Sequence, residues 1–118
     1  MLKDKKGIGF RFAWNGLIEM IKSEQNMKIH ILAAIIVIFI GFYAHLSLTE
    51  WAIIIIVIGF VMAMEMINTS IEKLIDYLKP DIHPTAKIIK DISAGAVLVA
   101  ALTALVVGLI IFIPKLIT

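Results

Sequence analysis

Residues 51–78 read WAIIIIVIGFVMAMEMINTSIEKLIDYL, and this stretch decides the fold. Its first half, residues 51–64, is wholly apolar, whereas its second half begins at Glu65 and is rich in acids, amides and hydroxyls. A transmembrane helix needs about 20 residues to cross the hydrocarbon of a bilayer, so the apolar half is too short by itself. We therefore predict one continuous helix over 51–78, with its apolar half in lipid and its polar half emerging at a membrane surface.

Two further apolar stretches flank this one, at residues 29–48 and 92–113. Hydrophobic residues make up 61% of the 118-residue chain, against roughly 45–50% in typical soluble domains. The composition indicates an all-α integral membrane protein that forms a single membrane domain over residues 1–118. Its three spans are predicted on helices over about 29–48, 51–78 and 87–113. The prolines expected to mark helix ends are Pro80, Pro84 and Pro114.

Basic residues are distributed unevenly around these spans, and this orients the chain. None lies between His45 and Trp51, and only Lys115 follows the third span. Because basic loops stay in the cytoplasm, we predict a cytoplasmic amino terminus, a carboxyl terminus outside, and a cytoplasmic second connection with access to nucleotide. No basic run of the kind that tracks nucleic acid is present, so no nucleic-acid partner is expected. The basic residues on the predicted cytoplasmic side are Lys3, Lys5, Lys6, Arg11, Lys22, Lys28, Lys73, Lys79, Lys87 and Lys90.

Residues 7–27 show helical periodicity before the first span. Apolar side chains recur at helical spacing, and polar side chains fall on the opposite face. This pattern predicts an amphipathic helix in the cytoplasmic interface, with Trp14 at headgroup level; an anchor without further function is the alternative. The apolar face is Phe10, Trp14, Leu17, Ile18 and Ile21, and the polar face is Arg11, Asn15, Glu19 and Lys22.

The polar half of the second span presents Glu65, Asn68, Thr69, Glu72 and Asp76 on one helix face. Glu65 should lie near the hydrocarbon boundary, where an ionisable group is costly and usually functional. Glu72 lies about 10 Å farther along the axis, where a hydrated cation could sit. Mg²⁺ prefers a few carboxylates together with phosphate oxygens and water.

Four other residues should reach the same membrane face. Glu24, just before the first span, could supply a second metal ligand, and Lys90, at the start of the third, could neutralise phosphate. Lys90 and its neighbour Asp91 could instead be an interfacial snorkelling pair. His83 lies beside this site and is a candidate ligand contact.

The remaining polar residues near the membrane surfaces have simpler interpretations. Four are expected to be solvated surface charges, and two histidines are expected to make interfacial hydrogen bonds. The four charges are Lys73, Asp76, Lys79 and Glu50, and the two histidines are His30 and His45.

The third span carries a small-residue stripe every fourth position, which lets helices approach closely in lipid. We interpret this stripe as a packing face. A purely structural membrane protein would need nothing more, but that interpretation leaves the acids without a role. The stripe consists of Ala96, Ala100, Ala104 and Gly108.

Two segments carry a family resemblance. The segment EMINTSIE at residues 65–72, followed by Asp76, and the segment AKIIKDISAGAV at residues 86–97 together resemble the prokaryotic diacylglycerol kinase family. The resemblance extends from Trp14 through the third span. It implies a homotrimer in the bacterial inner membrane whose active sites are shared between subunits. It also implies transfer of the ATP γ-phosphate to the hydroxyl of a lipid alcohol, with Mg²⁺.

The resemblance also implies roles for individual residues. Glu65 would be the general base, and Glu24 with Glu72 would hold the metal. The residues that would orient lipid and nucleotide are Asn68, Lys90 and Asp91, with His83 near the nucleotide and Trp14 near the lipid.

Two features of the sequence indicate which branch of this family the chain resembles. Phe12 stands where the Gram-negative branch has a nucleotide-contacting tyrosine, and Lys5 stands where it has arginine. The segment HPTAK at residues 83–87 is more similar to the Gram-positive branch, whose members resemble undecaprenol kinases. We therefore expect undecaprenol as the substrate, with diacylglycerol as the alternative. The alternative from a different functional class is a small proton-coupled transporter or channel, in which Glu65 would be an intramembrane proton carrier.

Overall fold

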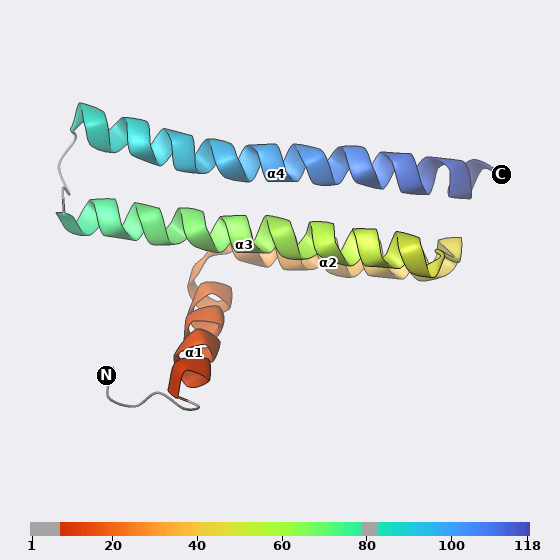
Figure 1. The fold of residues 1–118 in the computed structure, drawn as a ribbon, viewed down its shortest axis with the longest axis horizontal. Coiled ribbons are helices and arrows are strands. Elements are labelled where there is room, and N and C mark those ends of the chain that lie inside the picture. Colours follow the sequence, from red (N-terminus) through yellow and green to blue (C-terminus); the bar gives the residue numbers. More distant parts are fainter. Residues whose placement is uncertain (1–7, 79–82) are drawn as a thin grey trace.

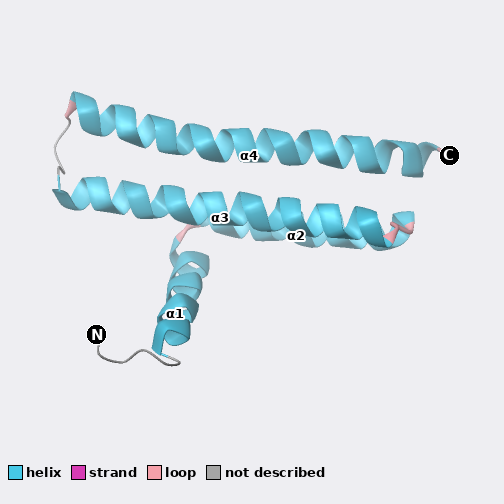
Figure 2. Ribbon diagram, viewed as in Figure 1, coloured by secondary structure: helices cyan, strands magenta, loops and turns pink. Residues whose placement is uncertain are grey.

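The computed structural model describes residues 8–78 and 83–118, and within them the chain is almost entirely helical (Figure 2). Three helices lie side by side, and a shorter one leaves the bundle at a steep angle (Figure 1). Three of these helices are long and apolar enough to cross a membrane. The prediction of an all-helical chain with three apolar spans is thereby confirmed. The helices are α1 (Ile8–Ser23), α2 (Gln25–Ala44), α3 (Leu48–Leu78) and α4 (Pro84–Ile117).

The boundary between α1 and α2 lies at Glu24, whereas the sequence placed the end of the first helix near residue 27. Glu24 has extended backbone angles, with φ −106° and ψ 116°. The hydroxyl of Ser23 donates to the carbonyl oxygen of Glu19 at 2.7 Å. A single extended residue is enough to turn the chain, so α2 begins immediately afterwards and runs through the bundle.

The turn between α2 and α3 is fixed by caps on both sides. His45 adopts a left-handed conformation with φ 56°, and the amides of His45 and Leu46 donate to the carbonyls of Phe42 and Gly41. This pattern ends a helix by satisfying its last carbonyls. On the other side, the Ser47 amide donates to Glu50 Oε1 at 2.9 Å, and the Glu50 amide donates to Ser47 Oγ at 3.2 Å. This reciprocal capping starts α3 three residues earlier than predicted.

Glu50 also ties this turn to the end of α4, so its prediction as a solvated surface charge is wrong. Lys115 Nζ lies 2.9 Å from Glu50 Oε1 and 3.4 Å from the carbonyl oxygen of His45. The predicted helix end at Pro114 is wrong as well, because α4 continues through Pro114 to Ile117. A proline in the last turn removes only one backbone hydrogen bond, and the contacts of Lys115 hold that turn in place.

The hydrophobic core of the chain lies toward this capped end. Leu46, Ile54 and Ile111 form its buried centre, and Trp51 and Phe112 pack against it. Many large apolar side chains elsewhere on the three long helices are exposed, which suits surfaces that face lipid. The opposite end of α3 and the start of α4 carry the polar residues, so the core and the acids occupy different ends of the bundle.

Helices α3 and α4 pack against each other along one face each. The small-residue stripe contributes Ala100, which is fully buried. Ala104 and Gly108 of the same stripe are only partly buried, and a Cβ atom at Gly108 would meet no atom within 4 Å. The stripe therefore serves close helix packing in its first part and leaves free space in its second.

Candidate active site

A buried acid and a histidine meet between α2 and α3. Glu65 is only 3% exposed, although it follows an apolar run. His30 Nε2 lies 3.4 Å from Glu65 Oε1. A buried carboxylate needs a polar partner, and the histidine supplies one from the neighbouring helix. His30, for which the sequence predicted interfacial hydrogen bonding, thus becomes a member of the candidate site.

Glu24 lies beside the same end of α3. Its Oε2 is 3.8 Å from Lys73 Nζ, and its side chain is half-buried at the start of α2. Lys73 follows Glu72 directly in the sequence, so Glu24 and Glu72 lie at a similar level of the bundle. The two predicted metal ligands, Glu24 at the N-cap of α2 and Glu72 on α3, therefore lie toward the same end of the molecule.

Lys90 of α4 faces α3 at this end. Its ammonium group lies 2.6 Å from Asp76 Oδ1, and it also interacts electrostatically with the Glu72 carboxylate. Asp76, predicted as a solvated charge, is exposed but engaged in this ion pair. The predicted approach of α3 acids and Lys90 is present in the structure, and it joins the two segments that carry the family resemblance.

Asp91 has a different ion-pair partner from its neighbour Lys90. It lies 2.6 Å from Lys87 on its own helix, and its side chain is 64% exposed. Lys90 and Asp91 thus have separate partners, and their interpretation as an interfacial snorkelling pair stays a prediction. Within one chain, Asp91 pairs with Lys87, and its predicted catalytic role remains a prediction.

Three buried polar side chains near these acids have no hydrogen-bond partner among residues 8–78 and 83–118. The unpaired atoms are Asn68 Oδ1, Thr69 Oγ1 and Ser93 Oγ. Buried polar atoms are rarely left unpaired, and an exception calls for a functional or structural explanation. Asn68 lies one helical turn from both Glu65 and Glu72, so its unpaired oxygen lies between the levels of these two acids on α3.

The donor set suits Mg²⁺ chemically. Carboxylate oxygens of Glu24 and Glu72 and the unpaired Asn68 oxygen are the hard ligands that this ion prefers. Within the described part of the chain, no three His, Asp or Glu side chains gather closely enough to enclose an ion by themselves. A site that binds Mg²⁺ here would therefore depend on phosphate oxygens and water as well.

The other predicted contacts lie at the edges of this region. His83 caps α4, and its Nδ1 accepts a hydrogen bond from the Thr85 amide at 3.2 Å. Phe12 and Trp14 are exposed on α1, which contacts α2. The structure of one chain does not bring these three residues to Glu65, and their roles toward nucleotide and lipid remain predictions. Lys79 and Lys5 lie outside the described residues.

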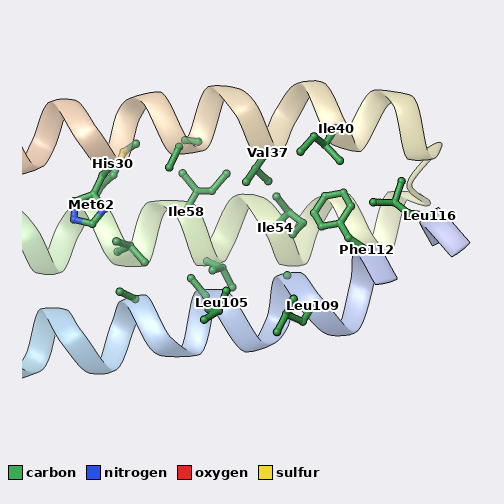
Figure 3. A pocket seen from close by; sticks show the side chains of 17 residues that line it. His30, Val37, Ile40, Ile54, Ile58, Met62, Leu105, Leu109, Phe112 and Leu116 are labelled. Carbon is green, nitrogen blue, oxygen red and sulfur yellow. The ribbon is translucent and has the colours of Figure 1, made fainter. Parts of the chain in front are cut away.

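An apolar cavity of about 420 Å³ lies between α2, α3 and α4 (Figure 3). Among the described residues that line it, His30 is the one polar side chain. Figure 3 shows His30 at one end and Phe112 and Leu116 toward the other. The cavity thus begins next to the His30–Glu65 contact and extends toward the capped end of the bundle.

Comparison with known proteins identifies the family of the chain. The sequence pattern of the family described as prokaryotic diacylglycerol kinase matches residues 11–112. The chain belongs to the prokaryotic diacylglycerol kinase family. The matched region of this diacylglycerol kinase family member includes the candidate site residues from Phe12 to Ser93.

Three of the curated relatives show how similar this diacylglycerol kinase family member is to known kinases. The undecaprenol kinase of Bacillus subtilis (strain 168) is 42% identical over 107 residues, covering 91% of this chain and 87% of that protein. A diacylglycerol kinase of Synechocystis sp. is 34% identical over 112 residues, covering 94% of this chain and 64% of that protein. A diacylglycerol kinase of Helicobacter pylori (strain J99) is 29% identical over 91 residues, covering 77% of this chain and 66% of that protein.

A spacing argument could have found His30 in this family member. His30 lies six residues after Glu24 on α2, and Glu65 lies seven residues before Glu72 on α3. On antiparallel helices these separations correspond to about 9 and 10.5 Å in the same direction. If Glu24 and Glu72 share a level, His30 and Glu65 must share one as well.

Proposed function

We propose that this chain, a lipid kinase by its family, transfers the γ-phosphate of ATP to the hydroxyl of undecaprenol, with diacylglycerol as the alternative acceptor. The observation that carries the proposal is the buried Glu65, paired with His30 and followed by acids and Lys90 toward one end of the bundle. The higher identity to the undecaprenol kinase than to the two diacylglycerol kinases supports the choice of acceptor.

The chemistry of the proposal follows from these positions. The lipid hydroxyl oxygen forms a bond to the γ-phosphorus, the bond from that phosphorus to the bridging oxygen breaks, and ADP leaves. Glu65 accepts the hydroxyl proton, and Asn68 orients the acceptor. Lys90 offsets phosphate charge, and Glu24 with Glu72 would hold Mg²⁺. When bound, Mg²⁺ would neutralise charge on the phosphates. Phosphoryl transfer depends mainly on positioning and charge stabilisation, so a small set of groups is sufficient.

The proposed setting is the bacterial inner membrane, with the amino terminus in the cytoplasm and the carboxyl terminus outside. At about 1.5 Å per residue, the 31 residues of α3 span about 46 Å and the 20 residues of α2 about 30 Å. The polar end of α3 therefore extends past the start of α2, where α1 departs at a steep angle (Figure 1). This arrangement supports α1 as a helix on the cytoplasmic surface beside the acids.

The proposed assembly is a homotrimer with active sites shared between subunits. Its support is that Asp91, Phe12 and Trp14 lie outside the cluster formed by one chain, while Ser93 and Thr69 are buried with no partner among residues 8–78 and 83–118. A neighbouring subunit would bring such residues to the acids of α3.

The transporter alternative receives less support. Such a protein requires its acid near the middle of the membrane. His30, the partner of Glu65, lies only five residues, about 7.5 Å, after the first residue of α2. The acid thus sits toward one end of the span, as a kinase acting at the membrane surface requires.

An assay in mixed micelles tests the proposed function. Purified protein is incubated with labelled ATP, Mg²⁺ and either undecaprenol or diacylglycerol, and labelled lipid is extracted and counted. We expect phosphorylated undecaprenol, less phosphorylated diacylglycerol, and loss of product in Glu72→Gln. Glu19→Gln, which changes an exposed acid on α1, should behave as the unaltered protein. Formation of no phosphorylated lipid with any alcohol would contradict the proposal.

A further inference from the structure

The apolar cavity between α2, α3 and α4 has a polar group at one end only. Its described lining is aliphatic and aromatic except for His30, whose ring also contacts Glu65. Its volume of about 420 Å³ falls in the usual range of about 300–1,000 Å³ for ligand pockets. A ligand complementary to this lining has a long apolar body and a single polar group at its end.

The length of the cavity narrows the choice of ligand. On α4 the lining extends from Ala101 to Leu116, which corresponds to about 22 Å along the helix at about 1.5 Å per residue. One leaflet contributes roughly half of the hydrocarbon thickness of about 30 Å. The cavity therefore reaches beyond the middle of the membrane, farther than a chain confined to one leaflet.

Small side chains on α4 keep the cavity open. Ala101, Ala104 and Gly108 line it, and a Cβ atom at Gly108 would meet nothing within 4 Å. Close packing of α3 and α4 is already provided by Ala100, which is fully buried. The small residues beyond Ala100 thus provide space and not helix contact within the chain.

We propose that this cavity binds the first part of a single polyprenyl chain, with its hydroxyl at His30 and Glu65 and its apolar body running toward Leu116. The inference rests on the proposed lipid kinase function and deepens it, because it makes the cavity the determinant of chain type. His30 acts as a positioning residue that links the cavity to Glu65. The remainder of a long polyprenol lies in the bilayer.

Filling the cavity at its middle tests this inference. Gly108→Phe places a ring in the free space at Gly108, and Gly59→Phe is the matched control because Gly59 is exposed on α3 and also has nothing within 4 Å of an added Cβ atom. We expect Gly108→Phe to raise KM for undecaprenol at least tenfold, with kcat changed less than twofold. KM for the five-carbon alcohol 3-methylbut-2-en-1-ol, whose single isoprene unit ends before the level of Gly108, should change less than twofold, and Gly59→Phe should match the unaltered protein for both.

Three outcomes would overturn the inference. KM for undecaprenol could remain unchanged in Gly108→Phe, or rise equally for 3-methylbut-2-en-1-ol and undecaprenol. Alternatively, Gly108→Phe could change the oligomer size measured by light scattering while Gly59→Phe does not, which would assign the cavity to a helix of a second copy.

A second measurement does not depend on activity. A geranylgeraniol analogue with a diazirine at the end remote from its hydroxyl is cross-linked to the unaltered protein without ATP, and labelled peptides are identified. We expect label at Leu109–Leu116, at least fivefold reduced by excess undecaprenol and by Gly108→Phe. Label that is spread over outward-facing residues and insensitive to competition would overturn the inference. If competed label appears at Leu109–Leu116 but no lipid is phosphorylated, the proposed kinase function fails and the binding site remains.

Discussion

Replacement of His30 by alanine tests whether the contact with Glu65 supports the active site. The change removes the imidazole whose Nε2 lies 3.4 Å from Glu65 Oε1 and leaves a carboxylate that is 3% exposed without this partner. Polar contacts between membrane helices are worth about 0.6 kcal/mol on average and up to about 1.7 kcal/mol. An unsatisfied buried polar group costs about 1–3 kcal/mol. We therefore expect His30→Ala to lower the free energy of unfolding by about 1–2 kcal/mol.

The assay is reversible unfolding in mixed micelles, followed by circular dichroism, together with steady-state kinetics. His30→Gln retains a side-chain donor and should recover at least half of the lost stability. If His30 also positions Glu65, His30→Ala should lower kcat by a larger factor than it changes KM for ATP. His30→Gln should restore part of the lost kcat. A loss below about 0.3 kcal/mol with unchanged kcat in His30→Ala would refute the reasoning, because additivity errors are of about that size.

Two further predictions concern the capped end of the bundle. Gly41→Ala should lower stability by about 1–3 kcal/mol, because the added Cβ atom would lie 2.7 Å from the Trp51 ring and overpacking has costs of that order; the same unfolding assay checks this, and a neutral effect would show that the ring can move aside. Lys115→Met should lower the melting temperature, because it removes the contact with Glu50 at 2.9 Å. Added salt should lower the melting temperature of the unaltered protein toward that of the variant, because salt screens the ion pair. Equal melting temperatures of the two proteins at low salt would contradict the role of this contact.

The helices could be predicted from sequence because each apolar run is long enough to cross a membrane. The continuous helix over residues 51–78 was predicted from the need to lengthen a short apolar run, and α3 ends at Leu78 as expected. The burial of Glu65 was predictable for a related reason, since a polar residue next to an apolar run of this kind must find a partner within the protein.

Other features depend on contacts between distant residues, and a local pattern does not contain them. Glu50 and Lys115 are 65 residues apart in the sequence, and their pairing explains both the half-burial of Glu50 and the continuation of α4 past Pro114. To predict His30 as the partner of Glu65, the register of α2 against α3 has to be known. The separate partners of Lys90 and Asp91 could not be predicted from the sequence, because adjacent residues on a helix can make different contacts.

Phosphoryl transfer by a Glu65→Gln variant tests the central claim most directly. Glutamine preserves the size of the side chain but cannot accept the hydroxyl proton. A general base contributes about 10²- to 10⁴-fold to a rate, so we predict that kcat for ATP-dependent phosphorylation of undecaprenol falls at least a hundredfold while oligomer size and stability match those of Glu19→Gln. Full activity in Glu65→Gln would contradict the assignment of Glu65 as the base that activates the lipid hydroxyl.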